Sequence, residues 1–229
     1  MKLLTLVALG KYDDIFQGFR KNVDEFVPAD KAFRVFVQDG LLITDTTGWL
    51  TVQGPKKFSM AGNANLGWKA VDPDSDILYL GDDVRFKQHG TVEALCAIAY
   101  SDPKIGMLSP KICGGADNPL QTNPPDEKLV YSDRYLALVC TYIKREVINK
   151  VGYLDEDTFK GYGSDDVDYS RRVQAAGYKL AVAPRIEVQH GLTRNGTETF
   201  LRNVGGYYED IQEEANRNAK ALEEKWAKK

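Results

Sequence analysis

The sequence has few of the residues that build disulfide or zinc scaffolds. Among its 229 residues are three cysteines and two histidines. Cys96, Cys113 and Cys140 lie far apart and match neither a disulfide framework nor the spacing of a zinc site. Free thiols are typical of proteins in reducing compartments, and we therefore expect reduced cysteines and a cytoplasmic location.

Long apolar runs and a basic excess are also missing. No window approaches the roughly 20 consecutive apolar residues of a membrane-spanning helix, so we predict no transmembrane segment. The apolar start, residues 1–10, is too short for a secretory signal and is interpreted as a buried strand. The 30 Lys and Arg residues and 33 Asp and Glu residues give a formal net charge of -3. Because nucleic-acid binding needs a basic face, we predict no nucleic-acid partner.

What the chain does have is an alternation of apolar runs and amphipathic stretches. The runs at residues 3–9, 33–37 and 76–80 are typical of strands covered on both faces, whereas residues 13–26 have the apolar spacing of a helix. The same criteria predict further helices over 61–71, 90–100, 165–176 and 207–226, and further strands over 105–108, 135–143 and 179–183. The turn-rich stretch 114–126 is predicted to be a long surface loop, and loops of this length tend to be functional.

This order of elements predicts an α/β fold. A strand, a helix and a second strand within the first 37 residues form a right-handed βαβ unit. The chain shows no internal repeat and no break in composition, so we expect a single domain with a mostly parallel, Rossmann-like sheet flanked by helices. Ligands of such sheets bind at the carboxyl ends of the strands. The candidate sites are therefore the strand exits near Gly10, at Asp39 and at residues 81–83.

Two adjacent carboxylates, Asp82 and Asp83, follow the predicted strand 76–80. Such neighbours repel each other unless a cation or solvent relieves them. A divalent metal at this exit would have hard oxygen ligands and open positions for a diphosphate. The alternative is an ordinary turn, because Gly-Asp-Asp is common turn chemistry.

A second acidic group begins the predicted helix 165–176. Ser164 is a candidate N-cap, so Asp165 and Asp166 would lie in the first turn, where the helix dipole favours ionised carboxylates. A carboxylate held there could act as a general base on an acceptor hydroxyl. The alternative is a well-capped helix without a catalytic role. For Asp168 we favour that alternative, with an i,i+4 pair to Arg172.

His190 follows the predicted strand 179–183 and is one of the two histidines. It could join Asp83 as a metal ligand, since imidazole together with carboxylate suits Mn²⁺ and similar ions. A lone histidine is more often a surface or core residue, and this alternative stays open. His89 has no candidate partner nearby, and we interpret it as structural.

Together these signals resemble the inverting GT-A glycosyltransferases of family 2, over nearly the whole chain up to Gly191. The most specific part is residues 140–190, in which the segment 163–168 is similar to the Glu-Asp motif of the family. The other segments that carry the resemblance are 142–147, 151–156, Phe159, Gly177-Tyr178, Pro184, His190, Asn65-Leu66-Gly67 and Asp39. There are two departures: Gly81 replaces the first Asp of the D-x-D motif, and Asp165 replaces the usual Glu.

The resemblance implies a role for each matching residue. Asp82 and Asp83 are similar to the D-x-D region, with Asp83 a ligand of a divalent metal, Mn²⁺ or Mg²⁺. His190 resembles a further metal ligand or a diphosphate contact. Asp166 resembles the catalytic base, and Asp165 beside it would help to hold the acceptor or the base. The nucleoside of the donor is expected at Asp39, Asn65 and the backbone at Ala8, Gly10 and Tyr12.

The implied activity is metal-dependent transfer of a sugar from a nucleoside-diphosphate sugar, by default a UDP-sugar, to a hydroxyl group. The acceptor would be a glycan or another hydroxyl compound, the transfer inverting, and the enzyme of the hexosyltransferase type. Residues 1–205 would form the GT-A domain, with a donor-binding half over 1–110 and an acceptor-binding half over 111–205. Residues 206–229 would form a C-terminal amphipathic helix. The loop 114–126 and the residues after Gly191 are expected to shape the acceptor site.

Other functions stay open at the level of the sequence. A sugar-nucleotide nucleotidyltransferase has a similar core, but it carries a glycine-rich, arginine-containing loop after the first strand, which residues 8–12 lack. A catalytically silent module that binds a nucleotide or a glycan would not hydrolyse the donor in a Mn²⁺-dependent way. A metal-dependent phosphohydrolase usually needs a denser cluster of His and Asp than two histidines allow.

Overall fold

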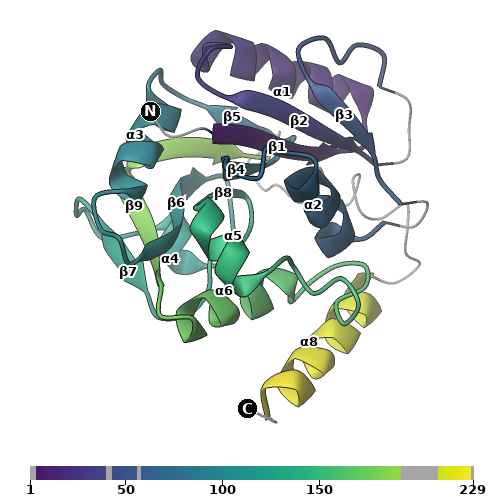
Figure 1. The fold of residues 1–229 in the computed structure, drawn as a ribbon, viewed down its shortest axis with the longest axis vertical. Helices are drawn as coiled ribbons and strands as arrows, with labels where there is room; N and C mark the ends of the chain where they lie inside the picture. The colour runs from purple at the N-terminus through teal and green to yellow at the C-terminus, as the bar shows by residue number, and fades with distance from the viewer. Residues whose placement is uncertain (1–3, 40–42, 56–57, 192–210, 228–229) are drawn as a thin grey trace.

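The fold is that of a computed structural model, which describes residues 4–39, 43–55, 58–191 and 211–227 (Figure 1). Strands and helices alternate through most of this part of the chain, as the sequence predicts. In chain order the elements are β1 (Leu4–Gly10), α1 (Asp13–Phe26), β2 (Phe33–Gln38), β3 (Leu50–Gln53), α2 (Met60–Lys69), β4 (Asp76–Gly81), β5 (Val84–Phe86), α3 (Thr91–Ala99), β6 (Ile105–Cys113), α4 (Pro119–Thr122), β7 (Val130–Ser132), β8 (Cys140–Ile143), α5 (Arg145–Val151), α6 (Asp165–Ala175), β9 (Lys179–His190) and α8 (Ile211–Ala227).

The strands form one mixed sheet in the order β3-β2-β1-β4-β8-β6-β9-β5, with β7 also paired to β9. The first four strands in this order are parallel to one another, and β6 is parallel to β9. Strand β8 is antiparallel to both of its neighbours, and β5 and β7 are antiparallel to β9. The predicted α/β domain with a mostly parallel sheet is therefore confirmed.

Helices cover both faces of the sheet because successive strand residues point to opposite sides. In β1, Leu6 and Ala8 enter the core that α1 and α3 cover, whereas Val7 and Leu9 enter the core that α2, α5 and α6 cover. Helix α2 lies very close to the sheet: a Cβ built on Gly67 would lie 2.4 Å from Cγ1 of Val7. Figure 1 shows α8 at the periphery, beside the connection between α5 and α6.

Strand β9 is longer than the sequence suggests. The prediction ended the strand at residue 183 because Pro184 follows, yet β9 continues to His190. The register explains the difference, since Ala183 pairs with Pro110 and the next pair joins Lys111 to Glu187. Pro184 therefore lies in an irregular stretch where the ladder does not need its missing N–H group. The extension brings the end of β9 to β5.

Other boundaries also differ from the predictions. The predicted strand 135–143 becomes regular only at Cys140, and β3, β5, β7 and α5 were not predicted. The stretch 114–126 is only partly a surface loop, because it contains α4 and the buried side chains of Asn118 and Gln121. Gln121 donates to the carbonyl of Ala137 at 3.1 Å and accepts from its N–H group at 2.7 Å. The predicted start of the last helix at residue 207 lies outside the described residues.

None of the helices in the described part of the chain has both the length and the apolar character required to cross a lipid bilayer.

Candidate active site

One half of the candidate site is built by the pairing of β5 with β9. In this antiparallel ladder Val84 lies opposite His190, and the carbonyl of Asp83 accepts a hydrogen bond from the N–H group of Gly191 at 3.2 Å. The side chains meet as well, with Nε2 of His190 3.5 Å from Oδ2 of Asp83. The two residues that the sequence singles out as metal ligands are therefore adjacent in the fold.

A backbone carbonyl determines which nitrogen of the His190 ring carries the hydrogen. Nδ1 of His190 lies 2.5 Å from the carbonyl oxygen of Gly115, which can only accept, so Nδ1 carries the hydrogen. In the neutral ring, Nε2 then presents a lone pair to the Asp83 carboxylate. Two facing acceptors are stable only with a proton or a cation between them.

This arrangement fits a divalent metal. A carbonyl that accepts from the remote ring N–H is the usual support of a metal-bound imidazole. Two ligand atoms bound to one ion at about 2.1 Å lie roughly 3 Å apart when they meet at a right angle. Among the described residues, no group of three or more His, Cys, Asp or Glu side chains could hold an ion. Asp83 and His190 are thus a pair of candidate ligands and do not form a complete metal site within the described part of the chain.

Asp82 points away from this pair and under the end of β1. It is 2% exposed, and a Cβ built on Gly10 would lie 2.1 Å from its Oδ2 atom. Burial, and then the neighbouring charge of Asp83, raise the pKa of Asp82 well above the usual value for a carboxyl group. Any side chain at position 10 would displace Asp82, which explains the glycine there.

The departure at Gly81 has a steric explanation. A Cβ built on Gly81 would lie 2.8 Å from Oδ1 of Asp83, closer than a real Cβ contact allows. A side chain at position 81 would therefore push the Asp83 carboxylate out of its present orientation, in which it faces His190.

The exits of β1 and β2 form the predicted nucleoside region. The N–H group of Asp39 donates to the carbonyl of Gly10 at 2.8 Å, which joins the two strand ends. Asp39 is 3% exposed, while Gly10 and Tyr12 are half-buried at the exit of β1. Ala8 lies within the sheet, fully buried and paired with Phe36 of β2 and Leu80 of β4. Its backbone is not available to a ligand, and the expectation for Ala8 is corrected.

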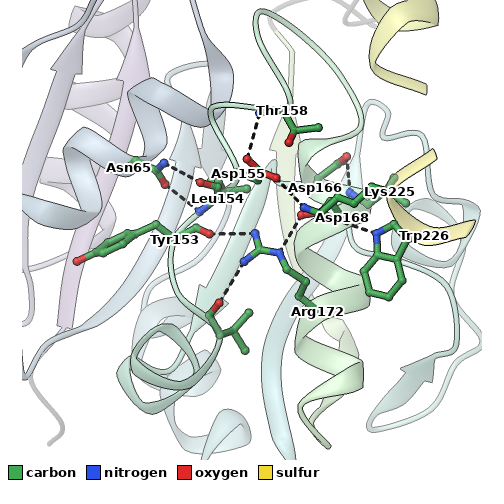
Figure 2. Close-up of polar contacts among 12 residues, drawn as sticks. Asn65, Tyr153, Leu154, Asp155, Thr158, Asp166, Asp168, Arg172, Lys225 and Trp226 are labelled. Carbon is green, nitrogen blue, oxygen red and sulfur yellow. Dashed lines mark hydrogen bonds and ion pairs between the residues drawn. The ribbon is translucent and has the colours of Figure 1, made fainter. Parts of the chain in front are cut away.

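Asn65 also has a different place from the one expected. Its amide nitrogen donates to the carbonyl of Leu154 at 2.9 Å, and its amide oxygen accepts from the N–H group of Leu154 at 2.9 Å (Figure 2). The side chain is 1% exposed. Asn65 therefore ties α2 to the segment before α6, and we remove it from the donor-binding set.

The second half of the candidate site lies at the start of α6. Ser164 precedes this helix, but its side chain makes no capping hydrogen bond and its backbone is left-handed, with φ of 69°. The predicted side-chain cap is therefore wrong. A serine in this region costs about 1–3 kcal/mol, and such strain clusters at functional sites. Its carbonyl still accepts the first helical hydrogen bond, from Asp168 at 3.0 Å.

Asp165 and Asp166 line a pocket of about 310 Å³ at this helix start. Two aromatic rings, Tyr135 and Tyr162, line it as well, and Asp117 contributes a third carboxylate. Asp165 is 5% exposed, and its Oδ2 atom has no hydrogen-bond partner within the described structure. The pocket thus combines aromatic walls with carboxylates that can accept hydrogen bonds from hydroxyl groups.

The environment of the pocket favours proton uptake by both acids. Burial raises the pKa of Asp165 to about 6. Burial, and then the charges of Asp165 and Asp117, raise the pKa of Asp166 to about 8. A carboxylate with a raised pKa is a stronger base once it has lost its proton.

The two halves of the candidate site share one segment of the chain. The segment after β6 contacts both: the carbonyl of Gly115 binds His190, and Asp117 lines the acidic pocket. Gly115 and Asp117 are two residues apart, so one short stretch of chain contributes to both halves.

Asp168 has the structural role that the sequence favours. It is fully buried and accepts from Nε of Arg172 at 2.8 Å (Figure 2). Lys225 and Trp226 of α8 bind its other oxygen, at 2.8 and 2.9 Å. A buried carboxylate with this many partners stabilises the fold and is not available to a substrate.

Sequence reasoning missed several pocket residues. Asp117 was included only within a loop expected to be functional, and Tyr135 only within a predicted strand. Tyr162 carried the clearest signal, because glycines flank it on both sides directly before the acidic pair.

Comparison with solved structures shows which fold this is. The crystal structure of GalNAc-T7 with UDP, GalNAc and Mn²⁺ covers 85% of this chain and 45% of its own, with a TM-score of 0.65 and 15% sequence identity. The crystal structure of S. aureus TarS covers 97% of this chain and 42% of its own, with a TM-score of 0.61 and 12% identity. This chain spans less than half the length of either protein. No protein-family model and no curated protein matches the sequence. The likeness confirms the predicted GT-A fold.

Proposed function

We propose that this chain is a metal-dependent glycosyltransferase that moves a sugar from a nucleoside-diphosphate sugar to an acceptor hydroxyl. The observation that carries the proposal is the Asp83–His190 pair, in which Nε2 of His190 lies 3.5 Å from Oδ2 of Asp83. A pocket lined by Asp166, the candidate general base, supports it. The solved GalNAc-T7 structure contains UDP, GalNAc and Mn²⁺, which supports a nucleotide-sugar donor and a divalent metal.

Asp83 and His190 would hold Mn²⁺ or Mg²⁺ against the diphosphate of the donor. A metal there neutralises the charge that develops on the leaving nucleoside diphosphate. The open positions around the two protein ligands are the ones a diphosphate and water would fill. The nucleoside, by default uridine, would lie at the strand exits, near Gly10, Tyr12 and Asp39, with Asp82 buried below them.

Asp166 would act as the base. The acceptor oxygen forms a bond to the anomeric carbon, the bond from that carbon to the phosphate oxygen breaks, and the hydroxyl proton passes to Asp166. Asp165 keeps the pKa of Asp166 high enough for this transfer, and Tyr135 and Tyr162 would contact the faces of a sugar ring. A single displacement with one base inverts the anomeric centre, as the resemblance to family 2 implies.

Several finer assignments belong to the proposal. These are membership of family 2, a hexosyl donor, a donor half over residues 1–110, an acceptor half over residues 111–205, a glycan acceptor and a cytoplasmic location. The Asp83–His190 pair links these two parts of the sequence, because Asp83 belongs to the donor half and His190 to the acceptor half.

A panel of nucleotide sugars tests the proposal directly. Each donor is added with Mn²⁺, with Mg²⁺ or with a chelator, and thermal stabilisation and release of the nucleotide are measured. We expect one donor class to stabilise the protein only with metal and to be consumed slowly by hydrolysis. Stabilisation without donor turnover would indicate a silent binding module, and turnover that Asp83→Ala does not reduce would contradict the metal assignment.

A further inference from the structure

The segment directly before the proposed base is an irregular connection between residue 160 and α6. Gly161, Gly163 and Ser164 all have left-handed backbones, with φ of 79°, 98° and 69°. Such a run of backbone has no ladder or helix of its own to fix it, so its position depends on groups that bind its polar atoms.

Helix α8 supplies most of those groups. The amide nitrogen of Asn218 donates to the carbonyl of Lys160 at 2.9 Å and to the carbonyl of Tyr162 at 2.9 Å. The carbonyl between them, that of Gly161, accepts from the N–H group of Met60 at 2.9 Å. Three successive carbonyls are thus held in place, two of them by one side chain.

Asn218 is built into this position. Its side chain is 1% exposed, although α8 as a whole is strongly polar and its neighbours Arg217 and Ala219 are exposed. Ala215, one turn earlier on the same helix, lies 3.7 Å from a Cβ built on Gly163 and lines the acidic pocket. Helix α8 therefore forms part of the wall of the pocket as well as holding the backbone beside it.

Two residues at the end of α8 fasten the helix to the same region. Nζ of Lys225 binds Asp155 at 2.7 Å and Asp168 at 2.8 Å, and Nε1 of Trp226 donates to Asp168 at 2.9 Å (Figure 2). Asp155 and Asp168 lie on either side of the irregular segment in the sequence. Helix α8 therefore contacts the chain before the irregular segment, within that segment and after it.

We propose that Asn218 is a positioning residue that fixes the segment 160–164 so that the Asp166 carboxylate lies at its working place in the pocket. The inference depends on the proposed role of Asp166 as a base. Asn suits the task because its amide offers two donors in one plane and carries no charge beside three acids. A misplacement of about 1 Å in a catalytic group can reduce a rate about 100-fold.

The test uses Asn218→Leu, which keeps the size of the side chain and removes both donors, and Asn218→Ser, which keeps one hydroxyl donor. Asn216→Leu is the matched control, because Asn216 is two residues away on the exposed side of α8. The wild-type enzyme with its best donor and acceptor is assayed first, so that absent transfer counts against the proposed function and not against Asn218. For each variant we measure kcat, the KM for the acceptor, the Kd of the metal-bound nucleoside diphosphate, and the pH profile.

We expect Asn218→Leu to lower kcat about 10- to 100-fold, with Asn218→Ser in between and Asn216→Leu unchanged. The acidic limb of the pH profile is expected to move in Asn218→Leu. The Kd of the nucleoside diphosphate should stay within about twofold of the wild type, because the proposed nucleoside site lies at the ends of β1 and β2 and not at α8. A wild-type kcat and pH profile in Asn218→Leu would overturn the inference. So would a parallel loss of donor affinity, since that indicates a general loss of structure. If Asn218→Leu does not fold, Asn218→Ser compared with Asn216→Ser gives the same decision.

Discussion

Nδ1 of His190 lies 2.5 Å from the carbonyl oxygen of Gly115, and this contact directs the opposite nitrogen of the ring toward Asp83. The two contacts come from different parts of the chain, one from the segment after β6 and the other from the turn before β5. When one ring nitrogen of a histidine is hydrogen-bonded and the other faces a carboxylate, that second nitrogen and the carboxylate can together bind a cation.

Removal of the imidazole should weaken metal binding. We expect His190→Ala to reduce the affinity for Mn²⁺ in the presence of UDP about 10-fold or more, because one of the two proposed protein ligands is lost. Calorimetric titration of Mn²⁺ measures the effect. His89→Ala is the matched control, since the His89 ring packs against Phe26, with ring centroids 5.0 Å apart. Equal affinities in the two variants would contradict the assignment of His190.

A methyl group at position 81 should have a smaller effect of the same kind. In Gly81→Ala the new Cβ would lie 2.8 Å from Oδ1 of Asp83, so the carboxylate must leave its present rotamer. An off-rotamer side chain costs about 0.5–1.5 kcal/mol, and we therefore expect a twofold to tenfold loss of Mn²⁺ affinity. Gly48→Ala, where nothing lies within 4 Å of the added Cβ, should leave the metal affinity unchanged. An unaltered affinity in Gly81→Ala would show that Asp83 does not bind the metal in this orientation.

The sequence was sufficient for the parts of the fold that depend on local pattern. The buried strands β1, β2 and β4 and the helices α1 and α6 follow from apolar periodicity, and the pair of Asp168 and Arg172 follows from helical spacing. The positions of Asp39 and Asp83 at the exits of β2 and β4 could be predicted because each follows a buried apolar run. These features need only short windows of sequence.

Features that depend on long-range pairing could not be predicted. Strand β5 has only three residues and exists because β9 continues past Pro184 to pair with it. The role of Asn65 was mistaken because nothing near it in the sequence indicates that Leu154 will accept and donate its hydrogen bonds. The contribution of Asn218 was invisible for the same reason. Each of these depends on which distant backbone groups lack partners, and periodicity carries no information on that.

The rate of transfer should rise with pH as Asp166 loses its proton. Burial and the charges of Asp165 and Asp117 raise the pKa of Asp166 to about 8, so kcat/KM is expected to increase through the neutral range. In Asp165→Asn the neighbouring negative charge is gone, the pKa of Asp166 falls, and the acidic limb should move to lower pH. A pH profile of both enzymes measures the shift. A limb that moves to higher pH, or does not move, would contradict the coupling of the two acids.

Loss of the base should separate activity from stability. We expect Asp166→Asn to reduce kcat about 10²- to 10⁴-fold, because the hydroxyl proton has no acceptor. The same variant should be more stable than the wild type near pH 8. The folded state holds the Asp166 proton at pH values where the unfolded chain has released it, so the wild type loses stability as pH rises from about 4 towards 8. Asn does not titrate and avoids this loss. Thermal unfolding at pH 5 and pH 8 tests it: the gain in Tm should be larger at pH 8.

Substitution of Asn65 should affect the fold and leave the donor site intact. In Asn65→Ala the buried N–H and carbonyl groups of Leu154 lose both partners, which lie at 2.9 Å in the wild type. An unsatisfied buried group costs about 1–3 kcal/mol, and for a domain of this size each kcal/mol lowers Tm by about 2–4 °C. The Kd of the metal-bound nucleoside diphosphate, measured well below the new Tm, should stay within about twofold of the wild type. Asp39→Ala is the contrasting variant. Asp39 lies at the exit of β2, and we expect its loss to weaken nucleoside binding. If Asn65→Ala weakened the donor as much as Asp39→Ala did, Asn65 would have to be returned to the donor site.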